Sequence, residues 1–210
     1  MSTLSYIDSK TARRSAMASG VLILSLFAVG CQGADASSAV ASHEVQSPVE
    51  RGQYLVTVAG CGDCHTPFKM GANGPEPDMS RMLAGHPAEM ALPPAPAAQG
   101  PWLWSGAATN TAFAGPWGVT YAPNLTPHKE TGLGLWTEDQ FLRAMRTGKH
   151  WGQADNRPIL PPMPWQNYAR MNADDLKAIY AYLRSVPSVE NLAPSTVPAP
   201  PLPAAVAASR

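Results

Sequence analysis

Residues 61–65 read Cys-Gly-Asp-Cys-His, and their types and spacing suit one particular chemistry. The thiols of Cys61 and Cys64 can each add to a vinyl group of a haem, and His65 can then bind the iron from one face. A Cys-x-x-Cys pair alone would also suit a thioredoxin-like redox centre or half of a zinc site. The histidine that follows, with no second such pair in the 210-residue sequence, favours one covalently attached haem c.

The overall composition narrows the classes of partner. The chain carries 15 basic and 15 acidic side chains, and charged residues make up only 14% of it. Because no basic stripe is present, we predict no nucleic-acid partner. The third cysteine, Cys31, leaves no pair for a structural disulfide, so the core and the cofactor must hold the fold together.

The N-terminal region is typical of an exported bacterial protein. Three basic residues precede an uncharged apolar run at residues 16–29, which is too short to span a bilayer comfortably. The run ends in Ala-Val-Gly before Cys31, which resembles a bacterial lipobox, where the cysteine is acylated and becomes the first mature residue. We therefore predict a signal peptide over residues 1–30 and lipidation of Cys31. Cleavage a little downstream and an uncleaved anchor are the alternatives, and all three place the domain on the periplasmic side of a bacterial membrane.

Three segments carry helix-capping signals. Ser47 and Glu50 form a capping box with a proline between them, and this helix should stop at Gly60, directly before the haem motif. A second capping box at residues 137–140 opens a helix that Gly148 should end. A third helix should begin after Asn172 as its N-cap and end before Pro187.

The first and last of these helices resemble those of a class I cytochrome c. The match lies in a short helix leading into Cys-x-x-Cys-His and a last helix that reads DDLKAIYAYLR at residues 174–184. In that family the two helices cross, with a glycine on the first opposite an aromatic residue on the last. Gly52 and either Tyr182 or Tyr180 are the matching residues here.

The resemblance implies an all-α class I cytochrome c fold, with three to four helices around one covalent haem, over residues 47–187. Residues 31–46 are then a flexible tether, and residues 188–210 form a Pro/Ala-rich tail that we expect to be disordered or loosely attached. Residues 115–136 and the helix that follows them are also similar to haem modules in the cytochrome subunits of membrane-bound dehydrogenases.

A long insertion follows the haem motif. Residues 66–116 contain nine prolines, so we expect little regular structure there. We expect Trp102, Trp104 and Phe113 to be packed rather than exposed. The favoured interpretation is a surface wrap that shields one edge of the haem.

The second iron ligand is predicted to be Met163. An electron-transfer haem generally has two protein ligands, and a methionine opposite the histidine raises the reduction potential. Met163 stands in the segment Ile-Leu-Pro-Pro-Met-Pro-Trp, where prolines on both sides favour a rigid loop, and it precedes the last helix by about the distance found in the family. A packing role for Met163 is the main alternative. The competing ligands are Met79, Met82, Met90, His86, His128 and His150.

Further contacts follow from the resemblance alone. His65 should donate its other ring nitrogen to a backbone carbonyl, for which the family's usual position implies Pro67. Aromatic and amide groups near such pockets bind the haem propionates or the methionine sulfur. The candidates here are Trp117, Tyr121, Asn124 and Trp165.

The expected function is electron transfer rather than catalysis. The partners would be redox proteins, namely a dehydrogenase, an oxidase or another cytochrome, and the membrane would be reached through the lipid anchor. Without that anchor the protein would be soluble in the periplasm. The alternative is a haem enzyme or gas-sensing domain whose sixth coordination position is open.

Overall fold

The computed structural model describes residues 46–96 and 101–199. The chain divides into two units at residue 43, and everything described here belongs to the second. The predicted signal peptide, Cys31 and nearly all of the predicted tether lie outside the described residues. Within those residues, no helix is both long enough and apolar enough to cross a bilayer.

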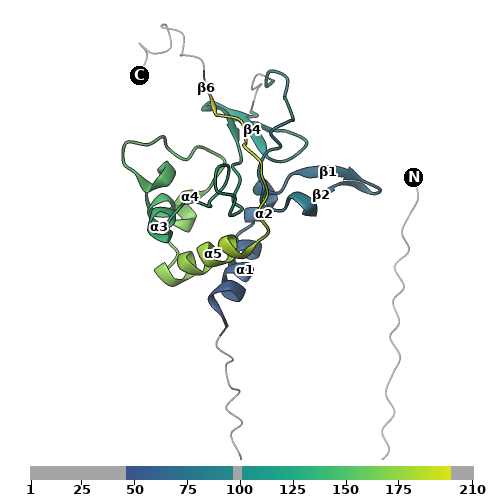
Figure 1. Ribbon diagram of the computed structural model, residues 1–210. Helices are drawn as coiled ribbons and strands as arrows, with labels where there is room; N and C mark the ends of the chain where they lie inside the picture. The colour runs from purple at the N-terminus through teal and green to yellow at the C-terminus, as the bar shows by residue number, and fades with distance from the viewer. Residues whose placement is uncertain (1–45, 97–100, 200–210) are drawn as a thin grey trace, which may run out of the picture. The chain divides into compact units, whose positions relative to one another are not determined.

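Helices provide most of the regular structure (Figure 1). The α-helices are α1 (Pro48–Val58), α2 (Cys61–His65), α3 (Glu138–Thr147), α4 (Trp165–Tyr168) and α5 (Ala173–Ser185). Two 3-10 turns are η1 (Met79–Arg81) and η2 (His150–Gly152). The strands are β1 (Phe68–Gly71), β2 (Gly74–Pro77), β3 (Ser105–Gly106), β4 (Ala112–Gly115), β5 (Gly118–Tyr121) and β6 (Val197–Pro198).

The predicted helix caps are confirmed. Ser47 and Glu50 form both hydrogen bonds of a capping box at α1, and Thr137 does the same with Gln140 at α3. The Asn172 side chain accepts a hydrogen bond from the Asp175 N–H at the start of α5. These side chains satisfy amide groups that the first turn of a helix leaves unpaired.

Helices α1 and α5 cross at Gly52, as the resemblance implied (Figure 1). A Cβ atom added at Gly52 would collide with the Ala178 carbonyl group and lie 2.7 Å from the Tyr182 Cβ. An ion pair between Arg51 Nε and Asp175 Oδ1, 2.9 Å apart, joins the two helices beside the crossing. A glycine is therefore required for the helices to approach this closely.

The core is formed where these two helices meet α3. Its buried residues include Leu55 and Val56 of α1, Phe141 of α3, and Leu176, Ile179 and Leu183 of α5. Leu176 is 0% exposed. This helical core forms a rigid frame at one side of the haem motif.

The all-α prediction is not confirmed, because residues 66–121 form strands. β1 and β2 make an antiparallel hairpin, and β3, β4, β5 and β6 make a four-stranded antiparallel sheet. Pro75 and Pro77 lie in β2, which has only one neighbouring strand, so their missing N–H groups interrupt no second ladder. Strands of two to four residues are too short for an alternating pattern, and the prolines obscured them further.

The expectation of a loosely attached tail is wrong for residues 188–199. Asn191 is only 3% exposed, and its side-chain amide donates to the carbonyls of Ala84 and His86, at 2.7 and 2.8 Å. Val197 of β6 pairs with Val119 of β5. The buried Asn191 amide, hydrogen bonds at the Val189 backbone and a two-residue strand attach this segment to the domain, and a Pro/Ala-rich composition reveals none of them.

The three aromatic residues of the insertion differ in their exposure. Phe113 is 5% exposed, as expected, whereas Trp102 and Trp104 are 76% and 49% exposed. The Trp104 ring meets Phe113 edge to face, with ring centroids 5.9 Å apart. The prediction that both tryptophans are packed is therefore wrong, because only Phe113 lies on a strand that faces the interior.

Candidate haem-binding site

A large, mostly apolar cavity lies against the Cys-x-x-Cys-His helix. It measures about 1230 Å³ when the space that opens to solvent is included. Its apolar wall includes Phe113, Leu125, Leu133, Phe141, Ile159 and Leu160. Cys61, Cys64, His65 and Met163 all line this one cavity, although Met163 is almost one hundred residues away in the sequence.

A sharp turn between α1 and α2 places the motif beside the cavity. Gly60 has a φ of +68°, in the left-handed region that favours glycine, and it is the N-cap of α2. The single turn of α2 then presents Cys61, Cys64 and His65 to the cavity. The Asn110 side chain, from the insertion, donates to the Asp63 carbonyl at 2.7 Å and holds the outer side of this turn.

The two thiols do not resemble a redox-active pair. Neither Cys61 nor Cys64 forms a disulfide. Burial raises the pKa of the Cys61 thiol to about 11, and burial, helped by Asp63, also raises the pKa of Cys64. Thioredoxin-like cysteines have a lowered pKa because the thiolate is the reactive form. Two apolar-facing thiols suit thioether bonds to a buried cofactor better.

His65 is held in the form that can bind a metal. It is 5% exposed, and its Nδ1 lies 2.8 Å from the Pro123 carbonyl oxygen. Because a carbonyl only accepts, Nδ1 carries the proton and Nε2 keeps its lone pair. Burial lowers the pKa of His65, with the Pro123 hydrogen bond opposing it, so the neutral ring is favoured.

The acceptor implied by the resemblance, the Pro67 carbonyl, is wrong. That carbonyl instead accepts from the Asp78 N–H at 2.8 Å, at the open end of the β1–β2 hairpin. The prediction that a backbone carbonyl orients His65 is correct, but the carbonyl belongs to Pro123. The insertion between the motif and Pro123 changes which carbonyl reaches the ring.

Two hydrogen-bonded segments hold the Pro123 carbonyl in place. His86 N–H donates to the Ala122 carbonyl and Leu125 N–H donates to the Leu83 carbonyl, both at 2.9 Å. Between them Gly85, with a φ of +80°, lies so close that an added Cβ would be 2.6 Å from the Pro123 carbonyl carbon. Residues 83–86 therefore act as the rigid backing of the His65 acceptor.

Hydrogen bonds with β5 and with the start of α4 hold the loop that carries Met163. Thr120 Oγ1 of β5 donates to the Pro161 carbonyl at 2.9 Å. The Met163 carbonyl accepts from the N–H of Trp165, the first residue of α4, at 3.0 Å.

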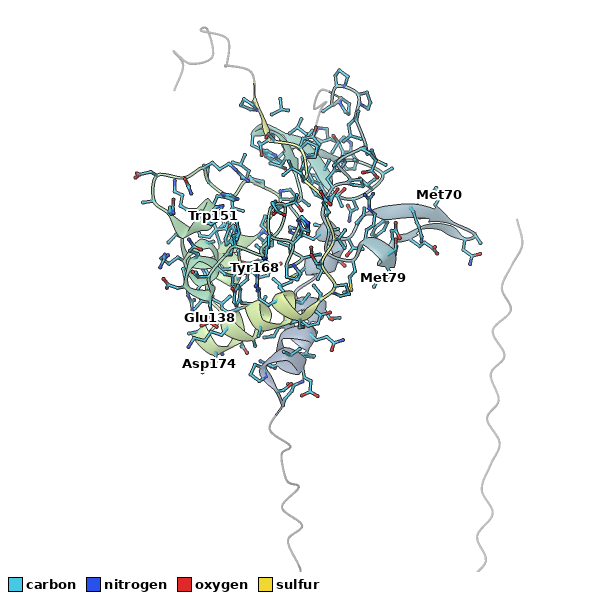
Figure 2. All side chains as sticks on the ribbon, in the orientation of Figure 1. Met70, Met79, Glu138, Trp151, Tyr168 and Asp174 are labelled. Atoms are coloured by element: carbon cyan, nitrogen blue, oxygen red, sulfur yellow. The ribbon has the colours of Figure 1, made fainter. Side chains whose placement is uncertain are left out.

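Of the competing ligands, only His150 also lines the cavity, and so does the core residue Met145. Met79 is 63% exposed and lies by the β1–β2 hairpin, away from the cavity residue Tyr168 (Figure 2).

The four predicted flanking residues divide into two pairs. Tyr121 and Asn124 line the cavity, whereas Trp117 and Trp165 do not. The Asn124 side-chain amide is fully engaged, donating to the Val189 carbonyl at 2.7 Å and accepting from Thr126 N–H at 2.9 Å. Both the donor and the acceptor of this amide thus bind the protein backbone.

Sequence reasoning gave no site role to three aromatic or basic residues of the cavity wall, namely Trp136, Arg157 and Tyr168. The Tyr168 hydroxyl donates to the Ala59 carbonyl at 2.8 Å, linking α4 to the end of α1. Burial is the main cause that raises the pKa of Tyr168 to about 12, and the nearby cysteines add to it. No periodic pattern surrounds these residues, so only their aromatic or basic character could have suggested a role.

These residues fit a covalently bound haem. Two thiols, an imidazole with a free Nε2 lone pair and a thioether line a single apolar cavity. Each has the chemistry expected of a haem c attachment or axial ligand. The fold and the site together are thus those of a haem-carrying domain.

Comparison with known proteins supports a haem-carrying domain. The Cytochrome c family profile, described as "Cytochrome c", matches residues 49–187. The chain therefore belongs to the cytochrome c family.

Several curated relatives are cytochrome subunits of dehydrogenases. The chain is 31% identical to the fructose dehydrogenase cytochrome subunit of Gluconobacter japonicus over 149 residues, which cover 70% of this chain and 23% of the relative. It is 27% identical to the cytochrome c subunit of the quinone-type alcohol dehydrogenase of Gluconobacter oxydans over 155 residues, 74% of this chain and 25% of the relative. It is 29% identical to the gluconate 2-dehydrogenase cytochrome c subunit of Pantoea cypripedii over 134 residues, 64% and 22% respectively. The chain thus spans about a quarter of the length of these relatives, and the predicted similarity to such subunits is confirmed.

Proposed function

We propose that this protein is an electron carrier with one haem c, bound through Cys61 and Cys64 and ligated by His65 and Met163. One observation carries the proposal. Two segments far apart in the sequence bring two thiols, an imidazole and a thioether to the wall of the same apolar cavity. A haem held there supplies an iron that can cycle between its ferrous and ferric forms.

The protein's own residues would hold the cofactor and limit its chemistry. Pro123 orients His65, and the prolines around Met163 restrict the second ligand. With the His65 imidazole and the Met163 thioether as its two protein ligands, the iron would have a raised reduction potential and no position left for a substrate. The apolar wall excludes water, which favours electron exchange through the haem edge over reaction with small molecules.

Met163 is a better candidate than the two other donors in the cavity. Met145 packs against the helical core, next to residues that α3 and α5 bury. His150 is half-buried and meets Trp136 edge to face at 5.4 Å. Met163 lies in a loop between η2 and α4 and is not among the residues that pack against the helical core.

Replacement of Met163 by alanine tests the assignment. The oxidised wild-type protein should show the weak red absorption band of methionine-ligated ferric haem, and Met163→Ala should lose it. The variant should also bind carbon monoxide when reduced, whereas the wild type should not. Met145→Leu is the matched control, because it removes a cavity sulfur but conserves volume, and it should keep the band.

Two results would count against the proposal. A band that survives in Met163→Ala would show that another residue binds the iron. Ready binding of carbon monoxide by the reduced wild type would support a haem enzyme or gas-sensing domain with an open sixth position.

The partner and the location follow from the relatives' names and from the N-terminal pattern. The relatives are cytochrome subunits of dehydrogenases, so we propose that this protein takes electrons from a dehydrogenase or passes them between such an enzyme and another redox protein. We place it on the periplasmic side of a bacterial membrane, with Cys31 as a lipid anchor. A purification that tests whether a dehydrogenase travels with it would examine the partner.

A further inference from the structure

The insertion leaves two tryptophans and a leucine exposed directly before strand β3. Trp102, Leu103 and Trp104, which we call the Trp-Leu-Trp segment, are 76%, 66% and 49% exposed. Since a whole tryptophan side chain covers about 250 Å², the two rings alone present about 300 Å² of mostly apolar surface. The largest apolar patch of a typical monomer covers about 300–600 Å² and often has a function. The segment is therefore large enough to form the centre of a contact surface.

The sheet next to this segment carries no charged side chain. Residues 90–127 and 191–199 contain no Asp, Glu, Lys or Arg, although these residues make up 14% of the chain. The two stretches are far apart in the sequence, but β6 of the second pairs with β5 of the first. The strands β3, β4, β5 and β6 therefore form one uncharged sheet (Figure 1). Depletion of charge and enrichment in tryptophan are typical of the core of a protein interface.

The Trp-Leu-Trp segment also lies next to the cavity. The Trp104 ring meets Phe113 of β4 edge to face, with centroids 5.9 Å apart, and Phe113 lines the cavity. Thr196, directly before β6, lines the same cavity. Whatever covers this segment is therefore close to the contents of the cavity.

A membrane is a poor candidate for the surface that covers this segment. The chain that follows the predicted lipid anchor at Cys31 enters the domain at α1, and Figure 1 shows α1 at the opposite end of the described unit from β4 and β6. The predicted tether of residues 31–46 has an expected end-to-end length of about 20–24 Å, whereas a domain of this size is about 40 Å across. Contact between the uncharged sheet and the membrane would stretch the tether well beyond its expected length. The segment is better placed for a protein.

The absence of charge favours a second copy of this chain as that protein. In a two-fold dimer the same patch lies on both sides of the interface, so a charged patch is repelled by its own copy. An uncharged patch meets no such repulsion, and tryptophan rings attract one another in stacked or edge-to-face pairs. A different protein with a charged contact surface would have to bury its charges against these rings, which is costly.

We propose that two copies of this chain associate through their Trp-Leu-Trp segments, which places their two cavities on either side of one interface. The association depends only on the apolar contact. Electron exchange between the two haems across the interface is its consequence, and that consequence rests on the proposed function. Standard interfaces bury about 800 Å² on each partner, so uncharged residues around the rings must contribute the remaining area.

Sedimentation equilibrium of the haem-loaded full chain in density-matched detergent measures the protein mass over a range of concentrations. The wild type should follow a monomer–dimer equilibrium. Trp102→Ser removes a ring from the centre of the interface and should raise the dissociation constant at least tenfold, because tryptophans are frequent hot spots. Trp102 is mostly exposed in one copy, so the fold should tolerate the change, and an unchanged haem absorption spectrum checks this.

Met70→Ser is the matched control, because Met70 is 77% exposed and lies in β1, on the hairpin that Figure 2 shows projecting from the domain. Its dissociation constant should equal that of the wild type. A Trp102→Ser variant that dimerises like Met70→Ser would overturn the proposal. If Trp102→Ser does not accumulate, Leu103→Ser decides in its place, and a wild-type dissociation constant there overturns the proposal.

A wild-type protein that stays monomeric at every concentration would also overturn the proposal. If another protein accompanies that monomer through purification, the segment belongs to a contact with that protein instead. The measured mass does not depend on the haem. Failure of the proposed function would be seen separately, as a denatured wild-type protein without covalently bound haem.

Discussion

His65 illustrates how a single side chain depends on contacts remote in sequence. Its ring is oriented by Pro123, and the backbone of residues 83–86 holds Pro123. The neutral tautomer that results has its Nε2 lone pair free for a metal. The proposed iron ligand is therefore local to the motif, while the residue that orients its ring follows the insertion in the sequence.

His86 is the second buried histidine of this region, and it has a structural role. It is 0% exposed, with Nδ1 2.9 Å from Thr111 Oγ1 and Nε2 3.2 Å from the Met90 carbonyl. Its ring packs on Tyr121 at 5.0 Å, and Tyr121 lines the cavity. Burial lowers the pKa of His86, so the folded protein favours the neutral ring.

The first prediction concerns pH. Because the folded-state pKa of His86 lies below its unfolded value of about 6.5, the unfolded state binds more protons as the pH falls through that range. Stability should therefore decrease below about pH 6.5, with at most about 1.4 kcal/mol per pH unit from this residue. His86→Gln should make the dependence shallower.

Urea unfolding of the haem-loaded protein at pH values between about 7.5 and 5 measures this slope. The variant will be less stable at every pH, because glutamine replaces the buried ring imperfectly, so the slope and not the absolute value is the test. Equal slopes for the variant and the wild type would contradict the assignment.

At the scale of elements, the crossing of α1 and α5 positions the haem motif. Helix α1 runs directly into α2, and its angle is set by its contact with α5. The ion pair of Arg51 with Asp175 and the hydrogen bond from Tyr168 to Ala59 secure α1 near the crossing and at its end. A change at the crossing should therefore move the cysteines as well as destabilise the core.

Gly52→Ala tests the crossing. The added methyl group meets backbone atoms of Ala178, which cannot move unless the helices separate. Overpacking costs about 1–3 kcal/mol, and a clash with backbone atoms puts this site at the upper end, above the gain of about 1 kcal/mol from replacing a helical glycine. We expect a net loss of about 2 kcal/mol in the free energy of unfolding, measured with urea.

Gln53→Ala is the matched control for that change, because the neighbouring residue is exposed on the same helix. Its stability should stay within about 0.5 kcal/mol of the wild type. If Gly52→Ala were as stable as Gln53→Ala, the close approach at Gly52 would not be required.

At the scale of the whole molecule, we propose that the haem-binding domain is exported and held at a membrane. The predicted signal peptide, the predicted lipidation of Cys31 and the predicted tether would supply this function, and they precede the first described helix. A lipid attached through a flexible segment would keep the carrier near a membrane-bound dehydrogenase and raise its effective concentration there.

Detergent phase partitioning of the expressed full chain tests the anchor. The wild type should enter the detergent phase because its acyl chains are apolar, and Cys31→Ala should move to the aqueous phase. Haem attachment, read from the absorption of denatured protein, should be the same in both. Wild-type protein that stays in the aqueous phase would contradict lipidation of Cys31.

Several features could be predicted from the sequence because their causes are local. The cysteines and His65 lie within five residues, so their spacing alone predicts haem attachment. The caps at Ser47, Thr137 and Asn172 depend on groups three residues apart, and all three are confirmed. Gly52 was identified only through the resemblance to class I cytochromes c.

The tertiary structure decided the features that depend on residues distant in sequence. The acceptor for His65 is Pro123 rather than Pro67, Asn191 holds the segment after α5 on the domain, and Arg157 faces the cavity. Each of these residues meets its partners because loops bring distant segments together. Such contacts leave no periodic pattern in a sequence rich in Pro and Gly. The sequence by itself determined which group could bind a haem, and the tertiary structure decided what surrounds that group, because the surroundings arise from contacts between segments and not from any one segment.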